Sequence, residues 1–218
     1  MKVRLMALMF FMSPAAWGAD LFVGAHAGAL LGYGAEVGLV FDRLTVRGQL
    51  SEYDYDESDT IDDVSYELEA ALDNRGVLLD YHLLGNGFFL SAGIYDNANS
   101  VNALGTPTAD TVLIGAVSYD ADDVGSLAAD VDFGGTSPYF GLGWDFGLAD
   151  KGFVASLEAG ALFNGDADAR LATVGGNPAV TNDPAFQAQL RQEEQELNDD
   201  LDDLSVLPVA KLGLRYYF

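Results

Sequence analysis

The sequence contains no cysteine, and it has only 10 lysine and arginine residues against 34 aspartate and glutamate residues. Without cysteine no disulfide can form in an oxidising compartment, so stability must come from packing and hydrogen bonds. The formal net charge of −24 argues against a nucleic-acid partner, because the phosphate backbone would repel such a protein.

Long apolar runs are also missing. The run Leu5–Met12 is far shorter than the roughly 20 residues that a membrane-spanning helix needs, and no later run approaches that length. A helical membrane protein is therefore excluded. Half of the residues are apolar, and glycine and aromatic residues are plentiful, which argues equally against disorder. The composition leaves an all-β chain, either soluble or embedded in a membrane.

The N-terminus has the order of a secretory signal peptide. Lys2 and Arg4 give a basic start, the apolar run follows, and the small residues Ala16 and Gly18 suit a cleavage site. We therefore predict a signal peptide over residues 1–18, cleaved after Gly18, and one domain over residues 19–218. The alternative is a buried N-terminal strand or helix.

Eight later segments alternate between apolar residues and polar or small ones, as strands of a membrane β-barrel do. The last segment, 206–218, shows this most clearly, with Leu212 and Leu214 on one face and Lys211 and Arg215 on the other. The polar faces of the eight segments give the candidate lumen-facing residues His26, Glu36, Arg47, Asp80, His82, Asp145, Glu158, Lys211 and Arg215.

Two of the segments are long, about 63–84 and 125–146, and the apolar face of each changes phase once. We interpret the changes, near 73–76 and 134–138, as β-bulges; the alternative splits both segments and gives ten strands. Connection lengths favour eight, because 42–43, 85–87 and 147–150 then form short turns on one side and the long connections all fall on the other. The prediction is an eight-stranded antiparallel transmembrane β-barrel with short periplasmic turns and long acidic extracellular loops.

The two longest predicted loops differ. Residues 97–124 show no helical periodicity, whereas residues 184–204 have the pattern of one amphipathic helix. Asp183 can cap that helix, and Pro184 suits its first turn. The apolar stripe comprises Phe186, Leu190, Leu197, Leu201 and Leu204. Such a helix is either a lid over the mouth of the barrel or a solvated surface helix.

Catalysis is not predicted, and neither is a cofactor or a metal. The chain has only two histidines, His26 and His82, and no serine stands in the G-x-S-x-G turn of a hydrolase. Opposite charges on the inward face predict ion pairs across a narrow interior instead. Eight strands leave an interior that side chains can just fill, so a polar plug and a pore both remain open.

Several stretches resemble a known family. They are YDYDES, GNGFFLSAGIYDN, VDFGGTSPYFGLGWDF, KGFVASLEAGALFNG and DDLSVLPVAKLGLRYYF. Together they are similar to small proteobacterial outer-membrane barrels of the ornithine-uptake, carbapenem-associated porin type. The resemblance implies the cell outer membrane, contact with its lipid and lipopolysaccharide, and uptake of small, often basic, amino acids. It also implies that the barrel-assembly machinery reads the final aromatic strand, which makes Phe218 the candidate assembly signal.

Two functions follow from these observations. The first is a narrow, weakly cation-preferring channel for passive uptake of small solutes, because an acidic exterior concentrates cations at the mouth. The second is a closed structural or interaction barrel whose acidic loops contact divalent cations, lipopolysaccharide or a surface partner. A soluble periplasmic β-sandwich is a third reading, and it requires the terminal aromatic residues to be core residues.

Removal of Phe218 tests the assembly signal. We expect the truncated protein to lose outer-membrane insertion, whereas Arg215→Gln should still insert, because Arg215 belongs to the inward face. The measurement is the fraction of each protein that stays with outer membranes after a carbonate wash. Equal insertion of the truncated and full-length chains would contradict the assignment.

Overall fold

The computed structural model describes residues 19–61, 63–147, 151–165, 167–202 and 204–218. The predicted signal peptide, residues 1–18, lies outside the described residues, as do residues 148–150 of one predicted turn.

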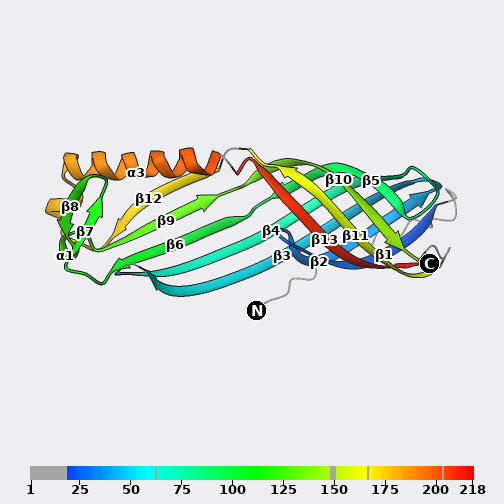
Figure 1. Ribbon diagram of the computed structural model, residues 1–218, viewed down its shortest axis with the longest axis horizontal. Coiled ribbons are helices and arrows are strands. Elements are labelled where there is room, and N and C mark those ends of the chain that lie inside the picture. Colours follow the sequence, from blue (N-terminus) through cyan, green and yellow to red (C-terminus); the bar gives the residue numbers. More distant parts are fainter. Residues whose placement is uncertain (1–18, 62, 148–150, 166, 203) are drawn as a thin grey trace.

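Eight antiparallel strands form a closed ring at one end of the molecule (Figure 1). They are β1 (Asp20–Gly28), β2 (Gly32–Phe41), β3 (Leu44–Ile61), β4 (Val64–His82), β5 (Phe88–Asn97), β10 (Gly135–Phe146), β11 (Gly152–Phe163) and β13 (Val206–Tyr217). Pairing of β1 with β13 joins the two ends of the chain, and pairing of β4 with β5 closes the ring. The predicted number of strands in the ring is confirmed.

The alternation of the sequence places apolar side chains on the outside of this ring. Phe153 is 69% exposed, Val77 58% and Leu142 52%, whereas Arg47 and Asp80 on the inner face are 0% exposed. This is the reverse of a soluble protein, in which the charged residues would face water and the apolar residues would form the core.

Beyond the ring, the sheet continues as a long extension (Figure 1). It consists of the outer halves of β3 and β4 together with β6 (Ser100–Pro107), β9 (Ser126–Asp132) and β12 (Asp168–Val174), in the order β3-β4-β6-β9-β12. The hairpin of β7 (Thr111–Ile114) and β8 (Val117–Asp120) lies at its tip with α1 (Ala121–Val124) and α2 (Pro178–Thr181). Helix α3 (Pro184–Asp202) runs along the extension.

The segment 97–124, predicted as an irregular loop, is therefore mostly strand. Strand β6 keeps the register of β5 against β4, since Asn74 pairs with Asn97 and Ala71 pairs with Ser100. Its sequence hides this because glycine, threonine and asparagine weaken the alternation that marks a strand. The long connections of the prediction thus build a second, water-exposed part of the same sheet.

The bulge predicted near 73–76 is wrong. Strands β3 and β4 pair without interruption from Leu44 with Tyr81 to Ile61 with Val64. The apolar residues change face because the surroundings of the strand change between extension and ring. In the extension, Leu68 and Leu72 stand on the face that continues the ring interior, where Leu78 is buried. In the ring, apolar residues such as Val77 stand on the outer face. The strand itself keeps its phase.

The second predicted bulge is present on one side of its strand. Against β5 and β6 the register is continuous, with Gly135 opposite Asn97 and Asp132 opposite Ser100. Against β11 and β12, Tyr139 pairs with Leu162 and Asp132 with Asp168, so six intervening residues face five. One extra residue therefore lies at the junction of ring and extension.

The predicted helix is confirmed, with the side chain of Asp183 accepting hydrogen bonds from the Ala185 amide at 2.8 Å and the Phe186 amide at 3.4 Å. Phe186 and Leu190 are buried in a small core with Ile114 and Val124. Leu204 lies beyond the end of the helix and is exposed. Helix α3 packs chiefly on β12 and β7, so it covers the extension and does not act as a lid over the ring. Among the described residues, no helix is long and apolar enough to cross a membrane.

Side chains of α3 also cover the outer edge of the extension. The Asn198 side-chain oxygen accepts from the Ala169 amide of β12 at 2.9 Å, and its amide donates to the Ala169 carbonyl at 3.0 Å. Glu194 accepts from the Leu171 amide at 2.9 Å. An exposed strand edge is a template for unwanted pairing, and polar groups of the helix fill this one.

Replacement of Asn198 tests this cover. Asn198→Ala removes both hydrogen bonds to Ala169, and we expect a local loss of about 1–2 kcal/mol. Hydrogen exchange should then accelerate at the Ala169 amide while the ring amides stay protected. Asp200→Ala, on the exposed side of the same helix, is the control, and equal acceleration in both variants would contradict the role of Asn198.

Candidate functional site

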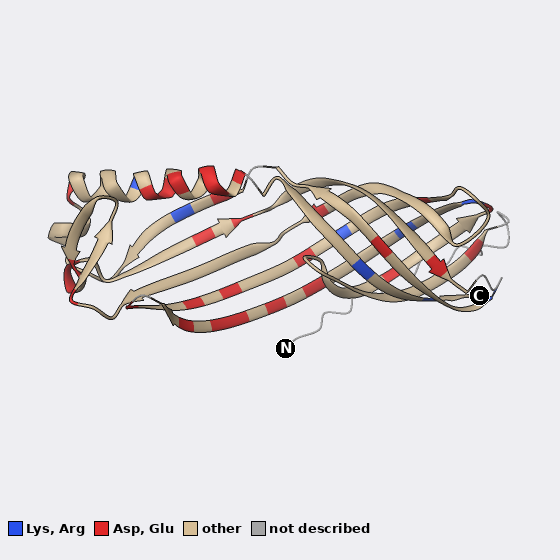
Figure 2. Cartoon of the chain, viewed as in Figure 1, with Lys and Arg blue, Asp and Glu red and all other residues tan. Residues whose placement is uncertain are grey.

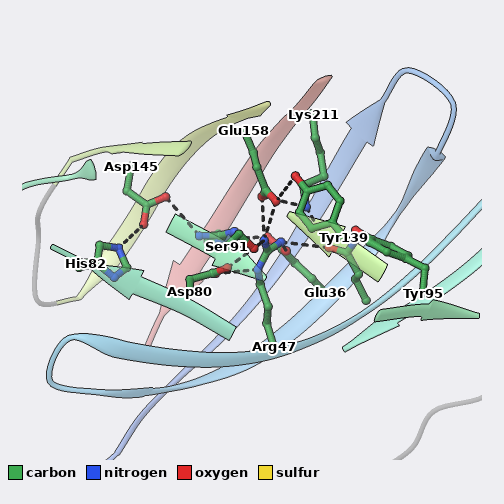
Figure 3. Close-up of polar contacts among 12 residues, drawn as sticks. Glu36, Arg47, Asp80, His82, Ser91, Tyr95, Tyr139, Asp145, Glu158 and Lys211 are labelled. Carbon is green, nitrogen blue, oxygen red and sulfur yellow. Dashed lines mark hydrogen bonds and ion pairs between the residues drawn. The ribbon is translucent and has the colours of Figure 1, made fainter. Parts of the chain in front are cut away.

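The interior of the ring holds all nine residues predicted to face the lumen. They come from seven of its eight strands: His26 from β1, Glu36 from β2, Arg47 from β3, Asp80 and His82 from β4, Asp145 from β10, Glu158 from β11, and Lys211 and Arg215 from β13. Eight of them are buried, and His82 is partly exposed. They form one connected cluster, apart from His26, which makes no hydrogen bond or ion pair within it (Figure 3).

Arg47 lies at the centre of this cluster. Its Nε and Nη2 atoms bind both oxygens of Asp80 at 2.7 and 3.1 Å, in a bidentate pair. Nη2 also binds Glu158 at 2.7 Å, and Nη1 binds Glu36 at 3.1 Å. The planar guanidinium has five donors in fixed directions, so one side chain holds carboxylates from three other strands.

The two other cations extend the cluster along the interior. Lys211 Nζ lies 3.0 Å from both Glu158 and the Gln49 side-chain oxygen. Arg215 binds Glu36 at 2.7 Å and Asp145 at 3.2 Å, and Asp145 in turn lies 3.3 Å from Nε2 of His82. With the histidines neutral, four buried carboxylates face three buried cations, so the formal charge nearly cancels.

Several neutral side chains complete the cluster, and these were not singled out as site residues from the sequence. The Tyr139 hydroxyl donates to Glu158 at 2.8 Å, Ser91 accepts from Arg47 at 3.2 Å, and Gln49 contacts both Arg47 and the Tyr95 hydroxyl. All four stand at inward positions of their strands. The alternation of the sequence predicts that these residues face inward. It does not predict which uncharged residues bind the charged cluster and which only fill space.

An apolar layer lies inside the ring on the side of the extension. It consists of Leu31, Leu78, Tyr95, Tyr139, Leu162 and Val209. Leu31 comes from the tight turn between β1 and β2, in which Leu30 has a φ of 64°, and it is completely buried. The burial of Leu31 could not be predicted from the sequence, because a single apolar residue in a turn has no periodicity.

The inward glycines contribute to the packing of the interior. A β-carbon at Gly141 or Gly160 would collide with the Tyr139 hydroxyl, and one at Gly143 would collide with the ring of Phe89. Aromatic rings thus occupy the space that these glycines free. The neighbours of these three glycines are packed side chains.

Among the described residues, no group of three or more histidine, aspartate or glutamate side chains is arranged to hold a metal ion. His26 and His82 stand on β1 and β4 and share no hydrogen-bond partner. The described contacts within the cluster are ion pairs and hydrogen bonds among its own side chains.

Known structures share this architecture. CarO of Acinetobacter baumannii superposes with a TM-score of 0.63 at 19% sequence identity, over 90% of this chain and 97% of that chain. CarO2 of the same organism gives 0.65 at 19% identity, over 91% and 98%. The chain has the fold of CarO. The resemblance to the carbapenem-associated type is thus confirmed for the fold. No family model matches the sequence, and no curated protein matches it.

Replacement of Arg47 tests its central place. Arg47→Met removes the cation and leaves three buried carboxylates without it, which should lower the free energy of unfolding by about 3–5 kcal/mol. Urea unfolding can be followed by the fluorescence of Trp144, which lies outside residues 1–18 while the other tryptophan, Trp17, lies within them. Arg43→Met, in an exposed turn, is the matched control; equal midpoints for the two variants would show that Arg47 is not central.

Proposed function

We propose that this protein is an outer-membrane β-barrel with a closed lumen, which anchors the acidic sheet of the extension outside the cell. The ring suits a membrane because its strands, 9 to 19 residues long, are long enough for the usual span of about 9–11 residues, and its outer face is apolar. Aromatic residues gather near both ends of that face, with Phe153, Tyr216 and Phe218 at one end and Phe140 and Phe163 at the other. Such aromatic girdles mark the two interfaces of membrane barrels.

The orientation follows from the connections. The chain turns at 42–43 and 85–87 at the end of the ring that carries Phe218, and the extension leaves from the opposite end (Figure 1). Barrels of this membrane have short periplasmic turns and long external segments. Acidic residues run along β3, β4 and α3 of the extension (Figure 2), which would make the external surface strongly negative.

Burial of the charged cluster is the observation that carries the closed lumen. Arg47, Asp80, Glu158, Lys211 and Arg215 are at most 2% exposed, and the pair between Arg47 and Glu158 joins opposite walls of the ring. A solute would have to separate these pairs and displace the apolar layer above them. Separating one buried pair leaves an unpaired charge, at a cost of several kcal/mol.

The narrow, weakly cation-preferring channel is the second candidate. It is favoured by the acidic extension, which would raise the cation concentration at the mouth, and basic amino acids are the solutes that this charge would suit. It requires the cluster around Arg47 to open. The two candidate functions thus differ in whether the lumen opens and whether a solute passes through it.

Conductance in planar bilayers separates the candidates. The purified protein should insert without producing current steps, because charged and apolar side chains fill the interior. Insertion is verified separately by protection of the ring from added protease. An absence of current then cannot result from a failure of the protein to insert. Cation-selective steps from inserted protein would refute the closed barrel and support the channel.

A further inference from the structure

One edge of the extension has no partner strand among the described residues. Strand β2 ends its pairing with β3 at Tyr33 opposite Glu52, and the nine residues from Tyr53 to Ile61 pair only with β4. These nine residues are all exposed. At about 3.3 Å per residue they offer an edge of about 30 Å, with backbone donors and acceptors along it that no second strand binds. One of these donors, the Thr60 amide, binds the Asp59 carboxylate at 2.7 Å.

The opposite edge of the same sheet is treated differently. There the polar side chains of Asn198 and Glu194 bind the backbone of β12. Natural proteins usually cover or blunt the edges of their sheets. This chain places a helix beside β12 and leaves β3 uncovered, so the two edges are not equivalent.

The charge around the open edge is of one sign. Between Tyr53 and Ile61 stand Asp54, Asp56, Glu57 and Asp59 and no basic residue. Asp56 lies directly opposite Glu69 of β4, and Glu52 lies opposite Asp73. Like charges directly opposite one another destabilise a pair of strands. A cationic partner beside the edge would offset this repulsion.

The two faces of the edge strand also differ. Asp54 and Asp56 point to one face, while Tyr53 and Tyr55 point to the other, which is the face that α3 partly covers farther along. At the Tyr53 end of the edge, an added strand would therefore meet Asp54 and Asp56 on one side and two aromatic rings on the other. Farther along, Glu57 and Asp59 stand on the tyrosine side.

We propose that the β3 edge, Tyr53–Ile61, binds an extended basic segment of another protein by strand addition. At the Tyr53 end, the segment would alternate lysine or arginine, facing Asp54 and Asp56, with apolar residues that pack against Tyr53 and Tyr55. Backbone hydrogen bonds supply affinity in this kind of recognition, and the alternate side chains supply specificity. A second copy of this chain does not fit, because pairing two such edges would bring four carboxylates against four.

This inference deepens the proposed function and rests on it only for the exposure of the edge to the outside. The test uses detergent-solubilised protein, so its outcome does not depend on whether the lumen conducts. The probe is a fluorescent nine-residue peptide of alternating lysine and valine. Two further peptides carry N-methyl groups, one on all the lysine amides and the other on all the valine amides.

Strand addition predicts unequal effects of the two methylated peptides. The one methylated on the amides that face β3 should bind at least about tenfold more weakly than the parent peptide, and the other should bind nearly as well. Attraction by charge alone would leave all three peptides equal, and that result would overturn the proposal. Absence of binding by the parent peptide would also overturn it.

Matched variants locate the binding. The double variant Asp54→Asn, Asp56→Asn should lower the affinity for the parent peptide by about tenfold. Asp130→Asn with Asp132→Asn, on the same face but three strands away on β9, should change it little. Equal losses would indicate a diffuse electrostatic effect. Concentration-dependent dimerisation of the free protein, measured by sedimentation and abolished by the Asp54 and Asp56 changes, would assign the edge to a second copy and contradict the inference.

Discussion

The bond between Arg47 and Glu158 spans the interior of the ring. Arg47 stands on β3 and Glu158 on β11, four strands apart in a ring of eight, so the contact at 2.7 Å joins opposite walls. Arg47 also binds Glu36 and Asp80 from its neighbouring strands. A buried charge is tolerable only with close partners. The ring must therefore stay narrow enough for these side chains to meet in its centre.

The side-chain pattern of the strands changes where the ring passes into the extension. In the ring, polar residues face inward and apolar residues outward. In the extension, the face that continues the interior carries Leu68 and Leu72 together with Glu57 and Asp59, and it packs partly on α3 through Phe186 and Leu190. The other face carries Asp54, Asp56, Glu67 and Glu69. No bulge between β3 and β4 is needed for this exchange, because the register runs on unchanged. One long hairpin thus serves two environments, with its side-chain pattern inverted where Asn74 and Asn97 meet.

The ring could be predicted from the sequence because the two faces of its strands meet different surroundings, with apolar side chains outside and polar side chains inside. A period of two residues, sustained over eight segments, is enough to place Arg47, Glu158 and their partners on one inner face. Which carboxylate meets which cation could not be predicted, since that depends on the stagger of strands that are far apart in the chain. Gln49 and Tyr139 were missed for a related reason: they are neutral, and their role exists only beside Arg47 and Glu158.

The extension was harder to predict. Its strands have small and polar residues on both faces, so residues 97–124 looked like a loop, and the change of apolar face looked like a bulge. A phase change in a strand pattern has two physical causes, an inserted residue or a change of surroundings. At 73–76 the surroundings change, whereas at 134–138 one extra residue is also present on one side. Only the paired register distinguishes the two.

The accessibility of the interior to a small reagent tests the proposed closed lumen most directly. The chain has no cysteine, so single cysteines report without background. Ser91→Cys places a thiol beside Arg47 at a position that is 3% exposed, and Ser58→Cys places one on the open edge of β3. A small cationic methanethiosulfonate should modify the thiol at 58 fully and leave the thiol at 91 intact in the folded protein. Modification of both at similar rates would show an open lumen and contradict the account.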